Sequence, residues 1–351
     1  MKAFMNLKPY LSHEKRLLKR LAPSRSGRTG AITAAAAAAT AAATAIWVET
    51  RARRAERESP PKGQFIDIDG VHVHYVMRGE GPPVVLLHGN NVTLDDFNAS
   101  GLMDRLVQSH RVIAFDRPGF GHSSRPRDRL WTPTAQAALL HAALEKLGIE
   151  RPVLVGHSMG AMVAMAVALD YPAAVRSLVL IGGYYYPTLR VGALLAAPVA
   201  LPVLGDVMRY TVTALSARLM LDGMVKAMFA PNDVPQYFLP AVSREMLLRP
   251  VQLRANAEDA TFMMSEAKSQ CARYAELKLP VTLVAGKNDK IVDTVAHSTR
   301  LHAELPQSEL RVQPGIGHMA HYFAQEQIVT AIDKPVISLA STGADGAARP
   351  A

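Results

Sequence analysis

The sequence holds a single cysteine and, over most of its length, almost no excess charge. Cys271 has no second cysteine to pair with, which excludes an internal disulfide. The formal net charge of +9 comes from residues 1–58, which hold 12 Lys and Arg against 4 Asp and Glu, whereas residues 59–351 hold 27 against 26. The nearly neutral remainder lacks a basic groove for phosphates, so nucleic acid is not an expected partner.

Strongly apolar residues are also sparse in the one long uncharged run, residues 29–48. Alanine and threonine dominate this run, and its 20 residues match the roughly 30 Å of hydrocarbon that a helix must cross. Trp47 stands where an interfacial aromatic residue would lie, and Arg51 follows shortly after. We expect an uncleaved transmembrane anchor that binds the lipid bilayer. A soluble alanine-rich helix and a cleaved signal peptide are the alternatives.

Basic residues flank this run unevenly. Eight Lys and Arg against one acidic residue precede it, in the N-terminal arm at 1–28. By the positive-inside rule, an inserted helix would place the N-terminus in the cytoplasm and the rest of the chain on the non-cytoplasmic side. Residues 49–63, with Pro60 and Pro61, are expected to form a linker.

Apolar runs after residue 64 predict a sheet. Residues 65–70 and 71–76 alternate around a turn and predict an antiparallel hairpin at its edge. His72 and His74 lie two residues apart in this hairpin and are interpreted as exposed strand residues rather than metal ligands. Continuous apolar strands then alternate with helical segments, which favours a mostly parallel sheet with helices on both faces.

One strand ends in a serine turn. The stretch from Val153 to Ala161 reads Val-Leu-Val-Gly-His-Ser-Met-Gly-Ala, and a helical pattern follows it up to Tyr171 and Pro172. Gly156, Ser158 and Gly160 match a nucleophile elbow, in which a strained strand-to-helix turn exposes a serine hydroxyl. The context of strand, serine turn and helix supports the motif.

A serine hydroxyl becomes a useful nucleophile only when an oriented base removes its proton. Asp289 follows directly after the apolar strand at 280–286, and His318 stands in a glycine-rich loop after a second short strand. Asp116 begins a Pro-Gly-x-Gly turn, so we expect it to accept backbone hydrogen bonds rather than serve as the acid. His321, close to His318, is expected to matter little for catalysis.

From about Gln64 to about Ile332, the chain resembles the α/β-hydrolase superfamily, with Ser, Asp and His in that family's order. Five segments carry the resemblance: His88-Gly89-Asn90, Asp116 to Ser123, Gly156 to Gly160, Gly286 to Asp289, and Gly317-His318. Ala161 stands where glycine is frequent in the family, and Asn90-Asn91 lacks the usual proline.

The resemblance implies a catalytic triad of Ser158, Asp289 and His318, with the backbone N–H groups of Asn90 and Met159 as an oxyanion hole. Relatives that open epoxides or displace halide use an aspartate at the elbow, where this chain has Ser158. Neither a metal nor an organic cofactor is implied.

About a hundred residues separate the sixth and seventh strands, more than a simple connection needs. We interpret them as a helical cap inserted after the sixth strand, whose methionines are mostly core and partly pocket lining. The expected organisation is an arm at 1–28, a transmembrane helix at 29–48, a linker at 49–63, the α/β-hydrolase core at 64–183 and 266–332, a cap at 184–265, and a disordered tail at 333–351.

The expected function is hydrolysis of apolar, uncharged carboxylic esters, small molecules that would be cleaved through an acyl-serine intermediate. A cofactor-free haloperoxidase or perhydrolase on the same triad is one alternative, and a non-catalytic ligand-binding protein is another. The sequence leaves acyl chain length and oligomeric state open.

Overall fold

A computed structural model describes residues 25–189 and 191–335 of the chain. It divides into two compact units, one ending at Trp47 and the other starting at Val48. We call the second the catalytic unit because it holds the three residues of the predicted triad. Most of the arm at 1–28 and of the tail at 333–351 lies outside the described residues.

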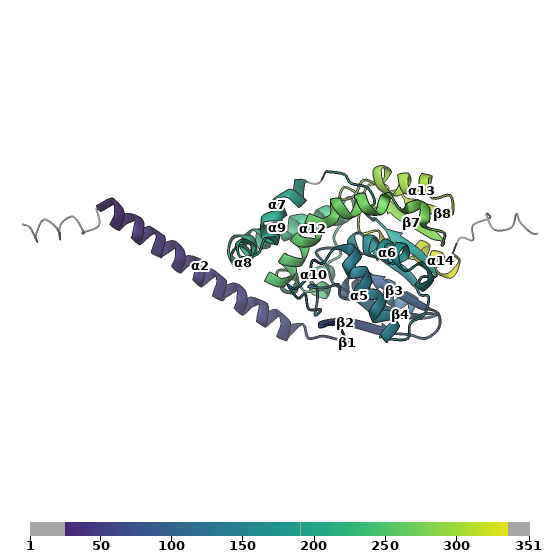
Figure 1. Ribbon diagram of the computed structural model, residues 1–351, viewed down its shortest axis with the longest axis horizontal. Helices are drawn as coiled ribbons and strands as arrows, with labels where there is room; N and C mark the ends of the chain where they lie inside the picture. Colours follow the sequence, from purple (N-terminus) through teal and green to yellow (C-terminus); the bar gives the residue numbers. More distant parts are fainter. Residues whose placement is uncertain (1–24, 190, 336–351) are drawn as a thin grey trace, which may run out of the picture. The chain divides into compact units, whose positions relative to one another are not determined.

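One eight-stranded sheet organises the catalytic unit (Figure 1), in the order β1-β2-β4-β3-β5-β6-β7-β8. The first two pairings, β1 with β2 and β2 with β4, are antiparallel, and all the others are parallel. The strands are β1 (Gln64–Ile68), β2 (Val71–Arg78), β3 (Pro83–Leu87), β4 (Arg111–Phe115), β5 (Val153–His157), β6 (Ser177–Ile181), β7 (Val281–Gly286) and β8 (Ser308–Gln313). The predicted edge hairpin and mostly parallel sheet are confirmed.

Helices cover both faces of the sheet. Because successive strand side chains point to opposite sides, each strand packs against helices on both faces. In β3, Val85 and Leu87 pack with α5 and α6, whereas Val84 and Leu86 pack with α3, α4 and α14. The helices outside the cap are α3 (Asp95–Ala99), α4 (Leu102–Leu106), α5 (Pro133–Lys146), α6 (Met159–Asp170), α13 (Arg300–Glu304) and α14 (Gln325–Asp333). Short 3-10 segments are Pro172–Ala174, Tyr274–Glu276 and Ala320–Tyr322, and Val295–Thr299 is a π-helical turn.

Six helices between β6 and β7 form the predicted cap. They are α7 (Val191–Ala200), α8 (Leu204–Tyr210), α9 (Val212–Phe229), α10 (Phe238–Val242), α11 (Arg244–Leu247) and α12 (Pro250–Cys271). The predicted boundary at residue 265 is wrong because it falls inside α12, which continues to Cys271.

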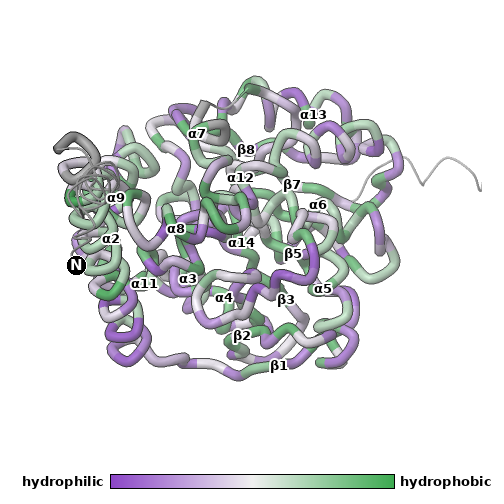
Figure 2. The backbone as a smooth tube through the Cα atoms, turned by 60° about the vertical axis from the view of Figure 1, so that its left-hand side comes forward, coloured by the Kyte–Doolittle hydropathy of each residue, from purple (hydrophilic) through white to green (hydrophobic). Residues whose placement is uncertain are grey.

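A single helix, α2 (Arg25–Glu58), covers the predicted anchor and continues for ten residues into the predicted linker. The linker assignment is therefore wrong for 49–58, where residues with good helix propensity extend the helix. The helix changes from hydrophobic to hydrophilic residues along its length (Figure 2). Its segment from Thr29 to Glu58 is the one described helix long and apolar enough to cross a membrane.

The last turns of α2 belong to the catalytic unit. Val48 and Ala55 are buried, and Arg51 and Glu56 form ion pairs with Glu245 and Arg249 at 3.2 and 2.8 Å. The hydrophilic end of this helix is therefore packed against the cap rather than free.

The hairpin histidines differ from the sequence-based interpretation. His72 is exposed as expected, but His74 is buried and its Nδ1 lies 2.7 Å from an Asp116 carboxylate oxygen. Asp116 also accepts hydrogen bonds from the backbone N–H groups of Leu94 and His122, at 2.9 and 3.0 Å. Burial alone would raise the pKa of Asp116, but these hydrogen bonds and nearby histidines hold it below its ordinary value.

Replacing Asp116 with asparagine should therefore lower the free energy of unfolding by about 3 kcal/mol, because two backbone donors and a buried histidine lose a charged acceptor. Denaturant unfolding measures the effect. Asp69→Asn, at an exposed turn of the same hairpin, is the matched control and should change stability little. Equal stability of the two variants would contradict the structural role of Asp116.

Candidate active site

Ser158 stands at the turn between β5 and α6, as the sequence predicts. Its φ of 53° is in the left-handed region, which is strained for a residue with a side chain. The flanking glycines allow the turn: a Cβ on Gly160 would lie 2.0 Å from the Leu87 carbonyl oxygen, and one on Gly156 would lie 2.5 Å from the Gly160 oxygen. The close approach of α6 to the sheet thus requires both glycines.

Asp289 and His318 meet beside this turn. The His318 Nδ1 lies 2.8 Å from the Asp289 Oδ2, and both side chains are buried. The other carboxylate oxygen of Asp289 accepts the backbone N–H groups of Ile291 and Val292, at 2.7 and 2.9 Å. These bonds fix the carboxylate, which in turn orients the imidazole.

An ionised carboxylate can only accept a hydrogen bond, so the Nδ1 of a neutral His318 carries the proton and Nε2 keeps a lone pair. Among the described residues, no hydrogen bond joins the Ser158 hydroxyl to His318. Such contacts in free enzymes often tighten only when substrate binds.

His157, immediately before Ser158, links the serine turn to the loop of His318. Its Nε2 lies 3.1 Å from the His318 carbonyl oxygen, and burial, followed by the neighbouring His321, lowers its pKa well below the ordinary value. A neutral imidazole that donates from Nε2 therefore joins the backbone of the two loops. Sequence reasoning did not assign this role to His157.

The two backbone groups expected to form an oxyanion hole belong to the start of α6 and to a loop that packs against the serine turn. Met159 is the first residue of α6, so its N–H has no acceptor within the helix. Gly89, which precedes Asn90, packs against the turn, because a Cβ there would lie 3.1 Å from the Ser158 Cβ. The structure thus brings the His88-Gly89-Asn90 loop to the serine.

Arg117 contacts this loop through several hydrogen bonds. Sequence reasoning did not single this residue out. The buried guanidinium donates to the carbonyl oxygens of His88 and Gly89, at 2.9 and 3.2 Å, and to the Asn90 Oδ1 at 2.6 Å. It also pairs with Asp259 in the cap at 2.6 Å. Arg117 therefore connects the His88-Gly89-Asn90 loop to the cap.

Asp259 is fully buried on α12 and carries a second ion pair. Arg125 contacts its Oδ1 at 2.9 Å, and Asn256, one turn earlier on the same helix, accepts the Asn91 N–H at 2.9 Å. The sequence gives no signal for these contacts because 142 residues separate Arg117 from Asp259.

Comparison with known proteins identifies the family. The profile of the family described as "alpha/beta hydrolase fold" matches residues 82–325, which is more than half of the chain. The chain belongs to the α/β-hydrolase fold family. It is similar to 2-hydroxy-6-oxononadienedioate/2-hydroxy-6-oxononatrienedioate hydrolase 2 of Pseudomonas putida, with 30% identity over 72% of this chain and 87% of that protein.

Two further similarities are informative about the fold. An uncharacterized protein of Mycobacterium tuberculosis is 28% identical over 79% of this chain and 81% of its own length. The crystal structure of an alpha/beta hydrolase fold protein from Burkholderia ambifaria matches with a TM-score of 0.66 and 22% identity, covering 77% of this chain and 97% of that one. The family assignment therefore covers the catalytic unit.

His88 has a structural role in this α/β hydrolase. Burial, with a further contribution from Arg117, lowers the pKa of His88 to about 4. The neutral ring accepts the Arg117 N–H at Nε2, 3.0 Å away, and donates from Nδ1 to the Gly89 carbonyl at 2.7 Å. Both bonds require the neutral tautomer.

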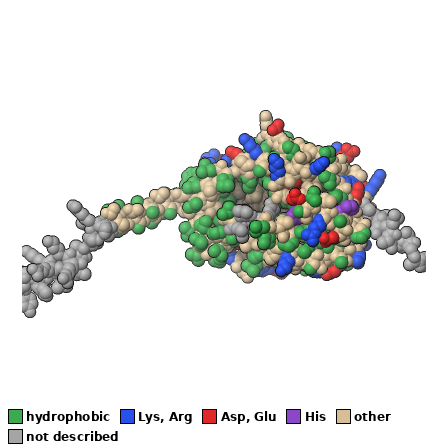
Figure 3. Space-filling model, turned by 90° about the horizontal axis from the view of Figure 1, so that it is seen from above, with side chains coloured by type: hydrophobic (Ala, Val, Ile, Leu, Met, Phe, Trp, Pro, Cys, Tyr) green, Lys and Arg blue, Asp and Glu red, His purple; other side chains and the backbone are tan. Residues whose placement is uncertain are grey.

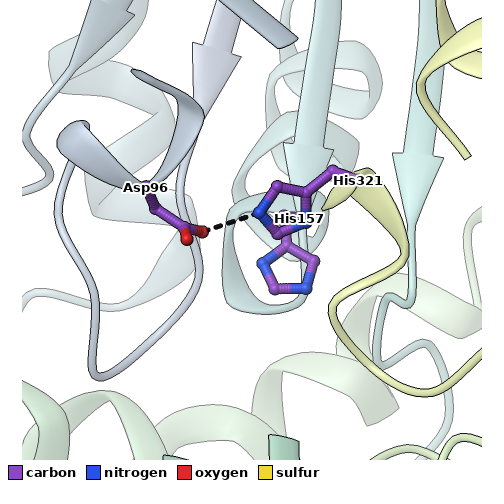
Figure 4. Close-up of side chains that lie close together, drawn as sticks. All are labelled: Asp96, His157 and His321. Atoms are coloured by element: carbon purple, nitrogen blue, oxygen red, sulfur yellow. Dashed lines mark hydrogen bonds and ion pairs between the residues drawn. The ribbon is translucent and has the colours of Figure 1, made fainter. Parts of the chain in front are cut away.

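Behind the serine turn, Asp96, His157 and His321 form a buried cluster (Figure 4). Their ligand atoms lie within 4.8 Å of one another, close enough to consider a metal ion. Both carboxylate oxygens of Asp96 are already engaged, one with the His321 Nε2 at 2.9 Å and the other with the Tyr322 hydroxyl at 2.8 Å. We therefore describe the cluster as a hydrogen-bonded support.

His321 lies three residues after His318 but has different contacts. It is fully buried and paired with Asp96, so its replacement should affect packing and stability, and the expectation that it matters little for catalysis stays a prediction. Met159, Met162, Met263 and Tyr184 form a separate buried apolar cluster next to Ser158. Among the cap methionines, which were expected to be mostly core, Met228, Met246 and Met263 are buried, whereas Met220 and Met264 are exposed.

The lowered pKa of His88 predicts acid sensitivity. In the unfolded chain the pKa of His88 returns to about 6.5. Below that pH the unfolded state therefore binds a proton at His88 that the folded state does not bind. Stability is therefore full above pH 6.5 and falls toward pH 4, by about 2 kcal/mol between pH 6.5 and 5 from His88 alone. Denaturant unfolding at pH 7.5 and pH 5 measures this loss.

A His88→Gln variant should show a smaller stability difference between the two pH values, because glutamine does not titrate. His72→Gln, at an exposed position of β2, should keep the full difference. The same pH dependence in wild type and His88→Gln would disprove the assignment.

Proposed function

We propose that this α/β hydrolase cleaves carboxylic esters of apolar, uncharged substrates through an acyl-serine intermediate. The observation that carries the proposal is the 2.8 Å contact between Asp289 and His318, placed beside a strained serine turn. A fixed carboxylate, an oriented imidazole and an exposed hydroxyl are what acyl transfer needs from side chains.

In the proposed mechanism, the Ser158 hydroxyl attacks the ester carbonyl carbon while His318 Nε2 takes its proton. The N–H groups of Asn90 and Met159 stabilise the oxyanion that develops. His318 then protonates the departing alkoxide, which leaves an acyl-serine. In the second half, water attacks this acyl group, His318 removes the proton of the water, and the acid product leaves while Ser158 regains its hydroxyl.

The preference for uncharged substrates is supported by the residues packed near the serine turn. Met162, Met263 and Tyr184 form a buried apolar cluster with Met159, and Arg117 is already neutralised by Asp259. The Pseudomonas putida relative is named for a dicarboxylic substrate, which would need unpaired cations at the site. Two alternative functions are peracid chemistry on the same triad and ligand binding without turnover. The tests below distinguish both from ester hydrolysis.

We also propose that α2 anchors the protein in a membrane, with the catalytic unit on the non-cytoplasmic side. The apolar segment from Thr29 and the excess of basic residues before it support this orientation. The buried Val48 and Ala55 show where a soluble fragment should begin: removal of residues 1–47 keeps the packed end of α2, whereas removal of 1–58 does not.

Ser158→Ala and His318→Ala should each lower kcat for an activated ester such as a p-nitrophenyl ester by about 10⁴-fold or more, because nucleophile and base act as one unit. Asp289→Asn should lower kcat by a comparable factor, since it favours the wrong tautomer of His318, and should leave KM nearly unchanged. Steady-state kinetics and fluorophosphonate labelling of the serine measure these effects.

Ser265→Ala, at an exposed position of α12, is the control for the serine substitution and should keep full activity. An active Ser158→Ala variant would disprove the mechanism. Turnover of peroxide and acetate exceeding that of esters would assign the triad to peracid chemistry, and absence of any turnover would indicate ligand binding.

The full-length chain should remain with membranes after a high-salt wash, because salt screens attraction by basic residues but not burial of an apolar helix. A chain starting at Val48 should be soluble and keep its esterase activity. Release of the full-length protein by salt alone would contradict anchoring and indicate a soluble helix, with the catalytic proposal unchanged.

A further inference from the structure

Large apolar side chains are exposed on one part of the cap. Among the described residues of the catalytic unit, ten of the sixteen exposed large apolar side chains lie between Leu189 and Met220. Figure 3 shows hydrophobic side chains gathered at one end of this unit. We define the cap patch by six of them, which lie on or beside α7, α8 and α9: Leu195, Val203, Val207, Val212, Leu215 and Leu219.

On helix α9, the residues of the cap patch form an outer surface that is separate from the residues packed in the core. Val212, Leu215 and Leu219 follow helical spacing on its first three turns and are 67%, 44% and 85% exposed. Leu221 and Val225, further along the same helix, are buried in the core of the cap. The helix is therefore apolar on its buried side and also on an outer face near its start.

The described charges within this stretch are paired. Asp206 accepts both guanidinium nitrogens of Arg127, at 2.6 and 2.7 Å, and also pairs with Arg209. Arg218 makes two contacts with Glu245, at 2.6 and 2.7 Å. An apolar surface with neutralised charges is costly in water and suits an apolar environment.

The chain enters the catalytic unit at the same part of the cap. Glu245 contacts Arg51 of α2 as well as Arg218 of α9, so one carboxylate joins the end of α2 to the start of α9. Burial, with a contribution from the Glu49 carboxylate that accepts its hydroxyl, raises the pKa of Tyr210 at the end of α8. Residues 49 and 51 thus contact α8 and α11 directly after the apolar segment of α2, and Glu245 links Arg51 to α9.

We propose that the cap patch is a second membrane contact, in which α7 to α9 lie in the interfacial layer of the bilayer that α2 spans. This inference rests on the anchoring proposed above. A bilayer is favoured over a protein partner because the segment that precedes Val48 is itself apolar enough for lipid, and its exit is fixed to the helices that carry the patch.

A cap seated in lipid also defines the substrate class. Esters with long apolar chains concentrate in the bilayer and would reach the cap without crossing water. The substrates would accordingly be esters dissolved in the membrane, such as acylglycerols or phospholipids, in preference to esters dissolved in water.

Fluorescence quenching by lipids tests the contact directly. Single-cysteine variants Leu195→Cys and Leu219→Cys, made with Cys271→Ser in the full-length chain, would carry an environment-sensitive NBD label in phosphatidylethanolamine and phosphatidylglycerol vesicles. Both labels should be quenched by doxyl-labelled lipid. Glu150→Cys, exposed before the start of β5 and therefore at the sheet edge opposite Ser158, is the matched control and should not be quenched.

A label at Thr40→Cys in the apolar part of α2 separates the two membrane contacts. Quenching at 40 without quenching at 195 and 219 would overturn the cap contact and leave the anchor intact. Quenching at 195 and 219 without quenching at 40 would keep the cap contact and overturn the anchor. A blue shift at 195 and 219 that lipid does not quench would indicate a second copy of the chain and overturn the proposal.

Activity separates the substrate class from the chemistry. A Leu195→Gln/Leu219→Gln double variant should keep its turnover of a water-soluble short-chain ester and lose about tenfold or more in turnover of a long-chain ester embedded in vesicles. Equal loss on both substrates, or on neither, would overturn the role of the patch. Failure of wild type on both esters would refute the ester chemistry and leave the quenching result to decide the membrane contact.

Discussion

The close contact between α6 and the sheet is the constraint on which the site depends. Hydrogen bonding holds β5 between β3 and β6, and α6 leaves β5 so abruptly that the Leu87 carbonyl occupies the space of a side chain at position 160. The chain accommodates this contact by placing Ser158 in a left-handed conformation. The parallel strands β5 and β7 then deliver the serine and Asp289 to the same edge of the sheet.

A network of buried charges extends this arrangement into the cap. Two arginines from the loop after β4 converge on Asp259, and one of them also holds the backbone of the His88-Gly89-Asn90 loop. Such ion pairs add little net stability compared with apolar packing, but loss of one partner leaves a buried charge alone. We interpret the network as fixing the position of the His88-Gly89-Asn90 loop relative to α12.

Much of the fold was predictable because it depends on local patterns. The strands follow from short apolar or alternating runs, and Ser158, Asp289 and His318 follow strand ends in an order that sequence displays. Contacts between distant segments were not predictable: Asp259 stands in an ordinary polar helix surface by sequence, and the burial of His74 depends on Asp116, 42 residues away. The extension of α2 was missed because Arg- and Glu-rich residues fit a helix and a linker equally well.

The same network restricts how the cap can open. Tilting α12 away from the sheet would separate Asp259 from both arginines in a dry environment, whereas α8 and the start of α9 carry their ion pairs at more exposed positions. Within the cap, α12 is therefore the fixed element, and α8 with the start of α9 is the part that can move. Reactants and products should pass along that movable part, and the release of a bulky product should depend on the mobility of these two helices.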